Sequence, residues 1–318
     1  MRALLVVNPK ATTTSGRTRD VLAHALASDL KLEVAGTEYR GHARDLARDA
    51  AASGTVDLVV ALGGDGTVNE VVNGLLAEGP SEHLPRLAVV PGGSTNVFAR
   101  ALGLPNDPVE ATGMLLDALS APGGSRERTI GLGRASTKGL PERWFTFTAG
   151  FGFDAGVVGR VEQHRRSGRR STHGLYLKQA VRHYIGEREH RRTGPITLSV
   201  PGAEPVDGLV VSIVSNTSPW TFLGNRPVYA SPEATFETDL DLFGLNRMSL
   251  VQTLRTIPQL LDASGAGPRG KHVVAYHDLA EFTLHSQEPL PFQVDGDHLG
   301  ERNQVSFSGV RRALRVIV

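Results

Sequence analysis

The chain has 318 residues and a mass of 34.0 kDa, which is enough for two domains that each have their own core. Its 34 Lys and Arg against 33 Asp and Glu give a net charge of +1, so general nucleic-acid binding is not expected. The absence of cysteine excludes disulfides, cysteine-ligated metals and thiol nucleophiles. No apolar run approaches a membrane-spanning length, and residues 4–7 are too short for the apolar part of a signal peptide, so we expect a cytoplasmic protein.

The first 124 residues alternate short apolar runs with amphipathic helical stretches. A polar or glycine-containing turn follows each of four such runs: 3–7, 32–34, 56–62 and 87–90. This alternation predicts a mostly parallel sheet with helices on both faces. Ligands bind such sheets at the carboxyl ends of the strands, which is where all four turns should lie.

After residue 124 the pattern changes to short strand-like runs separated by Gly, Pro, Asp and Asn, which predicts a β-rich, sandwich-like second domain over 125–308. The expected strands are 144–148, 196–200, 209–214, 282–285, 292–294, 305–307 and 314–318. The expected helices are 154–163, 175–184 and 250–261. The last segment, 309–318, has no continuation of its own, and we expect it to complete the sheet of the first domain, residues 1–124.

A glycine-rich turn, Gly63-Gly64-Asp65-Gly66-Thr67, joins the third apolar run to a helix. Its glycines let the backbone approach a ligand closely, and the start of the helix presents N–H groups and a positive dipole end. This combination suits a polyphosphate, and a carboxylate inside such a turn indicates a bridging Mg²⁺. The alternative is a tight turn in which Asp65 caps the helix. The segment is neither a Walker A loop nor a dinucleotide fingerprint, because both spacings are missing.

The other strand ends carry weaker signals of the same kind. The turn at residues 92–96 contains Gly93, Ser94 and Asn96, which could bind phosphate oxygens or cap the next helix. Asn8 and Thr37 close the remaining two strands. Taken singly, each is better explained as a turn residue.

Several motifs in a fixed order resemble the diacylglycerol kinase catalytic domain family, in its soluble bacterial branch related to sphingosine kinases. They are Asn8-Pro9, Thr37 before Gly41-His42-Ala43, the segment 63–75, Pro91 to Asn96, Ala149 to Ala155, Ser215-Asn216 and Asp295-Gly296-Asp297. Together they span nearly the whole chain. They are much more specific than Gly-Gly-Asp-Gly-Thr alone, which NAD kinases and phosphofructokinases also carry.

The resemblance implies an ATP-dependent lipid kinase, with diacylglycerol converted to phosphatidic acid as the leading reaction. It implies that ATP is bound by Asn8, Thr37, Gly63, Gly64, Asp65, Gly66, Thr67, Asn69, Glu70, Gly93, Ser94 and Asn96. Asp65 should belong to a Mg²⁺ and water network. Another hydroxyl-bearing lipid, such as a sphingoid base, is the alternative substrate, and NAD kinase is a more distant alternative. A catalytically weak lipid-binding regulator is the alternative from a different class.

The family's Asp-Gly-Glu appears here as Asp295-Gly296-Asp297, and the resemblance implies that one of the two carboxylates accepts the proton of the lipid hydroxyl. Asp297 matches the usual proton acceptor, while Asp295 is close enough to contribute metal or base function. Asp-Gly by itself is also a good hairpin turn. In relatives a structural magnesium site lies near a turn that corresponds to residues 236–241, where Asp239 is the best candidate ligand although the glycine is absent.

Residues 160–192 contain ten Lys and Arg against only three Glu, an excess of positive charge. This excess indicates docking to an anionic membrane surface, where each such charge contributes about 1 kcal/mol. A solvated charged face is the alternative. We therefore expect a peripheral protein of the inner membrane face whose partner is its lipid substrate, and the number of copies is left open, with a homodimer as one option.

Overall fold

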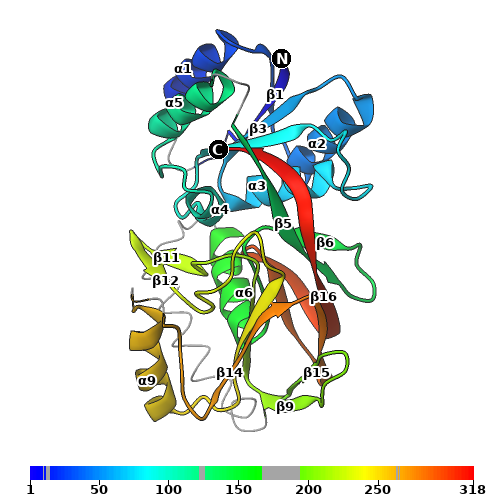
Figure 1. The fold of residues 1–318 in the computed structure, drawn as a ribbon, viewed down its shortest axis with the longest axis vertical. Helices are drawn as coiled ribbons and strands as arrows, with labels where there is room; N and C mark the ends of the chain where they lie inside the picture. Colours follow the sequence, from blue (N-terminus) through cyan, green and yellow to red (C-terminus); the bar gives the residue numbers. More distant parts are fainter. Residues whose placement is uncertain (10, 12–14, 122–125, 167–193, 263, 265) are drawn as a thin grey trace. The chain divides into compact units, whose positions relative to one another are not determined.

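A computed structural model describes residues 1–318 except 10, 12–14, 122–125, 167–193, 263 and 265 (Figure 1). The chain forms two compact units: unit 1 is Met1–Gly131 with Arg311–Val318, and unit 2 is Leu132–Val310. The chain passes from one unit to the other twice, within strand β5 (Glu127–Ser136) and within strand β16 (Asp297–Ile317).

Unit 1 is an α/β structure with a parallel sheet, which confirms the architecture predicted for this part. Its strands are β1 (Arg2–Val7), β2 (Lys31–Gly36), β3 (Leu58–Gly63) and β4 (Arg86–Pro91), in the order β2-β1-β3-β4. The end of β16 lies parallel to β4, with Val316 opposite Leu87. The helices are α1 (Gly16–Ala27), α2 (His42–Ser53), α3 (Asp65–Leu75), α4 (Val97–Ala101) and α5 (Pro108–Leu119).

Helices cover both faces of the unit 1 sheet. Alternate residues of β1, such as Leu5, share a core cluster with Leu26 of α1 and Leu115 of α5, because successive side chains of a strand point to opposite faces. Helices α2 and α3 pack together on the other side (Figure 1), and the small buried Ala43 and Ala47 let α2 approach closely. The carboxyl ends of the four strands therefore lie at one edge of this sheet, between the two helical layers.

Unit 2 is β-rich, as predicted. Its elements are β6 (Arg143–Phe145), β7 (Thr148–Gly152), β8 (Ile196–Ser199), β9 (Val206–Leu209), β10 (Val211–Ser215), β13 (Leu240–Leu245), β14 (Val273–Leu279), β15 (Glu281–Val294), the separate hairpin of β11 (Thr221–Leu223) and β12 (Arg226–Val228), and the helices α6 (Phe153–Arg166) and α9 (Leu250–Leu260). The main strand order is β14-β13-β10-β7-β15-β16. The helices predicted at 154–163 and 250–261 are confirmed, and the one at 175–184 lies outside the described residues.

The sandwich-like character of unit 2 arises from one continuous sheet and not from two separate ones. The first half of β15 pairs with β8 and its second half pairs with β7. This strand therefore joins the part of the sheet that contains β8 to the part that contains β7. The predicted strands 282–285 and 292–294 are both parts of β15, and 305–307 and 314–318 are both parts of β16. The register shifts between His285 and Leu290 explain why the intervening segment does not show strand-like alternation. A single core cluster contains side chains from most of these strands, including Phe151, Phe292 and Phe307.

The predicted strand 144–148 is interrupted in the structure. Strand β6 ends at Phe145 and β7 begins at Thr148, because the N–H groups of Thr146 and Phe147 bind a carboxylate instead of a neighbouring strand. No helix in the described part of the chain is long and apolar enough to span a membrane.

Candidate functional site

Two glycine turns meet at the carboxyl edge of the unit 1 sheet. The turn after β3 and the turn after β4 are joined by a hydrogen bond from the Gly92 N–H to the Gly63 carbonyl, at 2.8 Å. A Cβ on Gly93 would lie 2.7 Å from the Cα of Gly64, which is closer than non-bonded carbon atoms can approach. Glycine is therefore required here because the two backbones touch.

Asp65 joins the helices that follow these two turns. Its carboxylate oxygens accept hydrogen bonds from the N–H groups of Val97, at 3.0 Å, and Phe98, at 3.2 Å. Asp65 therefore caps helix α4. The alternative derived from the sequence was that Asp65 caps its own helix, α3. Burial lowers the pKa of Arg100 in α4, and the nearby Asp65 carboxylate opposes part of this shift. The half-buried Asp65 holds the second glycine turn against the start of α3.

Two asparagines fix the shape of the turns. The Asn8 side chain donates to the Thr67 hydroxyl at 3.1 Å, which ties the end of β1 to the first turn of α3. Asn96 adopts a left-handed conformation with φ of 49° and exchanges two hydrogen bonds with the Gly93 backbone. Ser94 lies in the same turn and is exposed.

The remaining residues predicted to bind the nucleotide brace the helices. Glu70 accepts a hydrogen bond from the Gly41 N–H at 2.9 Å, at the start of α2. Asn69 is buried and accepts two hydrogen bonds from the Asn73 amide, one turn further along α3. The Thr37 N–H donates to the Val7 carbonyl, which places Thr37 at the same sheet edge as the glycine turns.

The carboxylate pair of the sequence lies on a two-residue hairpin in unit 2. Val294 pairs with Asp297, so Asp295 and Gly296 form the turn between β15 and β16. Both have positive φ, 46° and 82°, as a type I′ turn requires. The segment is therefore a hairpin turn, as its Asp-Gly sequence indicated, and it carries both carboxylates.

Asp295 is a buried anchor. Its two oxygens accept four hydrogen bonds, from the Thr146 N–H and hydroxyl and from the N–H groups of Phe147 and Thr148, at 2.7 to 3.1 Å. The Asn216 amide donates to the Thr146 carbonyl at 3.0 Å and so holds the same segment, residues 146–148, which we name the 146–148 strap. Burial raises the pKa of Asp295, and the four donors oppose this shift. Its acceptor sites are filled, since a carboxylate has about four, and it is therefore poorly suited to accept a proton from a substrate.

Asp297 is in a different environment two residues further on. Its side chain is 24% exposed, and the Arg143 guanidinium lies 3.5 Å from one oxygen. A carboxylate with this exposure is accessible to a ligand. Of the two carboxylates, Asp297 is therefore the one that a ligand can reach.

A chain of two hydrogen bonds also holds the Asp295-Gly296 turn in place. The Gly296 N–H donates to the Gln293 amide oxygen at 3.0 Å, and the Gln293 amide nitrogen donates to Asp154 at 2.9 Å. Asp154 lies in the first turn of α6 and is buried. Burial raises its pKa from 3.8 to about 6, and the Gln293 hydrogen bond opposes the shift. The hairpin that carries Asp297 is therefore fixed by Asp295 on one side and by Gln293 on the other.

The buried Asp154 should make stability depend on pH. Between pH 3.8 and about 6 the folded state holds a proton that the unfolded state has lost, so the free energy of unfolding should fall as the pH rises, by about 3 kcal/mol in total. Asp154→Asn keeps an acceptor for Gln293 and cannot ionise, so this loss should be absent in the variant. Urea unfolding of both proteins at several pH values measures the difference. Equal pH dependence in the two would show that Asp154 titrates normally.

The metal site predicted at Asp239 has no cluster of ligands around it: in the described residues, no three His, Asp or Glu side chains are arranged to hold an ion. The neighbouring carboxylates have other roles. Asp278 accepts from the Asp239 N–H, and Asp241 accepts from the Asp278 N–H and binds His277 at 2.8 Å. Of the predicted membrane segment 160–192, residues 167–192 lie outside the described part of the chain, and Arg160 is exposed.

Three functional candidates were not singled out from the sequence. Asp154 lies inside the motif at 149–155, so a signal for it was present. Gln293 and Arg143 stand in strands with no pattern of their own, and only their contacts with Gly296 and Asp297 reveal them.

Solved structures identify the fold. The crystal structure of a diacylglycerol kinase from Bacillus anthracis str. Sterne is similar with a TM-score of 0.69 and 22% identity, over 99% of this chain and 96% of that one. An NAD kinase from Archaeoglobus fulgidus in complex with ATP is similar with a TM-score of 0.50 and 13% identity, over 100% and 94%. The chain therefore has the fold shared by these kinases, an α/β unit followed by a β-rich unit.

The sequence comparisons give the family of the first part of the chain. Residues 2–123 match the diacylglycerol kinase catalytic domain family. The diacylglycerol kinase of Bacillus subtilis (strain 168) is 43% identical over 129 residues, 38% of this chain and 40% of that protein. One from Staphylococcus aureus (strain JH9) is 40% identical over 126 residues, 37% of each. These matches confirm the resemblance seen in the motifs, and the chain spans about two fifths of the length of these relatives.

Proposed function

We propose that the protein is an ATP-dependent lipid kinase that converts diacylglycerol to phosphatidic acid. The observation that carries this proposal is the contact between the two glycine turns at the carboxyl edge of the unit 1 sheet, within the segment that matches the diacylglycerol kinase catalytic domain. The curated relatives of this segment are named diacylglycerol kinases, and a solved structure with the same fold is a complex of an NAD kinase with ATP.

Unit 1 would hold the nucleotide. Backbone N–H groups at the turns and at the start of α3 supply donors and a positive dipole end for phosphate oxygens. No hydrogen bond from a described side chain caps α3 at Gly64. Asp65 fits a water-mediated contact with Mg²⁺, because it is half-buried at this edge, and Mg²⁺ commonly keeps several waters and is bound through one or two carboxylates plus phosphates. The ion would neutralise charge that develops on the transferred phosphoryl group.

Unit 2 would supply the base. The oxygen of the lipid hydroxyl attacks the γ-phosphorus of ATP, the bond from that phosphorus to the β–γ bridging oxygen breaks, and ADP leaves. Asp297 accepts the proton of the hydroxyl. Asp295 cannot do so without giving up its hydrogen bonds to the 146–148 strap, so its role is to hold the turn.

The test is ATP consumption with a panel of acceptors: diacylglycerol, sphingosine, ceramide and NAD. We expect turnover with diacylglycerol, and a large loss of turnover in Asp65→Ala, which releases the start of α4, and in Asp297→Ala. Turnover with sphingosine or NAD in place of diacylglycerol would reassign the substrate. A protein that binds lipid vesicles and consumes no ATP with any acceptor would be a lipid-binding regulator, and the proposal would be wrong.

A further inference from the structure

Helix α9 of unit 2 has an inverted distribution of side chains. Leu250, Val251, Leu254 and Ile257 are 64%, 59%, 63% and 46% exposed. The polar Gln252 and Thr256 are buried, at 8% and 3%, and they bind each other at 3.2 Å. Residues at spacings of three and four share one face of a helix, so the apolar side chains form a single exposed stripe. We name these four residues the α9 stripe.

Packing among the described residues of unit 2 leaves the α9 stripe exposed. The opposite side of α9 packs on unit 2. Leu260 contacts the core cluster that contains Ile213 and Phe243, and the Tyr229 N–H donates to the Leu260 carbonyl at 2.7 Å. Four large apolar side chains on one exposed helical face are the kind of patch that marks an interaction surface.

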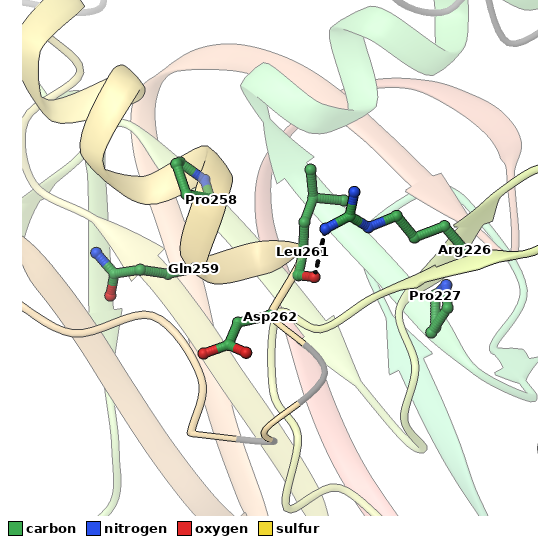
Figure 2. A pocket seen from close by; sticks show the side chains of 6 residues that line it. All are labelled: Arg226, Pro227, Pro258, Gln259, Leu261 and Asp262. Carbon is green, nitrogen blue, oxygen red and sulfur yellow. Dashed lines mark hydrogen bonds between the residues drawn. The ribbon is translucent and has the colours of Figure 1, made fainter.

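Three arginines lie on or beside α9, against one exposed acid, Asp262, just after its end. Arg255 lies on the helix, which contains no Asp or Glu. The Arg269 N–H donates to the Gln259 side chain at 2.7 Å, and the Arg226 guanidinium donates to the Leu261 carbonyl at 3.1 Å. Figure 2 shows Arg226 beside the depression at this end of the helix, lined by Arg226, Pro227, Pro258, Gln259, Leu261 and Asp262. All three arginines are exposed.

We propose that the α9 stripe and its arginines dock the protein on an anionic lipid bilayer. A helix with one apolar face and cations along its border lies in the interface of such a bilayer, with the apolar side chains among the acyl chains. A second copy of the chain fits less well, because α9 itself carries no acidic residue that could pair with the arginines of the other copy, whereas an anionic bilayer supplies negative charge. This deepens the proposed function, since a lipid kinase must reach a substrate held in a membrane, but the docking itself needs no catalysis.

The test is sedimentation with vesicles of phosphatidylcholine, with and without phosphatidylglycerol, using the whole chain. Wild type should bind the anionic vesicles. Leu254→Ser with Ile257→Ser should weaken this binding at least about tenfold with an unchanged melting temperature, because both side chains are exposed. The matched control is Val21→Ser with Val109→Ser, which removes two equally exposed apolar side chains from helices of unit 1 and should leave binding unchanged.

The charge part of the proposal is tested separately. Arg255→Glu with Arg269→Glu should abolish the preference for anionic vesicles, while Arg17→Glu with Arg126→Glu, the same change of net charge in unit 1, should not. Equal binding by wild type and the Leu254/Ile257 variant would overturn the proposal. So would sedimentation equilibrium that shows a dimer of wild type and a monomer of that variant without vesicle binding, which would assign the α9 stripe to a second copy.

Activity measurements distinguish this inference from the proposed function. The Leu254/Ile257 variant should phosphorylate a short-chain diacylglycerol in solution at the wild-type rate and lose turnover on vesicles. If wild type binds vesicles through α9 and phosphorylates no lipid in either form, the kinase proposal fails and the docking surface stands.

Discussion

Asp297→Asn should lower kcat by about 10²- to 10⁴-fold, the usual contribution of a positioned general base. The amide keeps the size of the side chain and cannot accept the hydroxyl proton. The melting temperature should change little, because Asp297 is partly exposed and its ion pair with Arg143 at 3.5 Å is worth at most about 1 kcal/mol. Steady-state ATP consumption with diacylglycerol, measured beside thermal unfolding, gives both quantities.

Two variants control this experiment. Asp297→Glu restores the longer carboxylate of the family pattern and should retain far more activity than Asn, since a base remains within reach. Glu301→Gln removes an exposed carboxylate from the same hairpin and should be neutral. A wild-type kcat in Asp297→Asn would exclude Asp297 as the base.

Asp295→Ala should destabilise unit 2 by about 3–5 kcal/mol. The substitution leaves the buried N–H groups of Thr146, Phe147 and Thr148 without their acceptor, and each unsatisfied buried donor costs about 1–3 kcal/mol. Removal of the buried carboxylate relieves its own desolvation, which is why the net loss is smaller than the sum over three donors. Urea unfolding measures the change.

Asp297→Ala is the matched control for this prediction, because it removes a carboxylate two residues away that is 24% exposed and pairs with the Arg143 guanidinium. It should change the free energy of unfolding by less than about 1 kcal/mol. Asp295→Asn should be nearly as destabilising as Asp295→Ala, because an amide offers one acceptor oxygen where the strap needs two. Equal stability of Asp295→Ala and wild type would mean that water replaces the carboxylate in the strap.

The different environments of Asp295 and Asp297 show where reasoning from the sequence stops. Both carboxylates were candidates for the base, because Asp-Gly-Asp places them two residues apart with no local feature to separate them. The partners of Asp295 lie 147 to 149 residues earlier in the chain, and Gln293 meets Asp154 across 139 residues. These distances in sequence are closed only by the pairing of β7 with β15.

The sequence by itself determined the alternation of strands and helices in unit 1, the β-rich second unit and the glycine turns, because periodicity and positive φ depend on residues close together in the chain. Its motifs in a fixed order also carried the resemblance to the diacylglycerol kinase catalytic domain family, whose model residues 2–123 match. Only the tertiary structure decided that Asp65 caps α4, that Asp295 is an anchor and that α9 turns its apolar stripe outward. Burial and hydrogen bonding depend on which distant segments pack together, and the amphipathic pattern of a helix does not say which of its faces the rest of the chain covers.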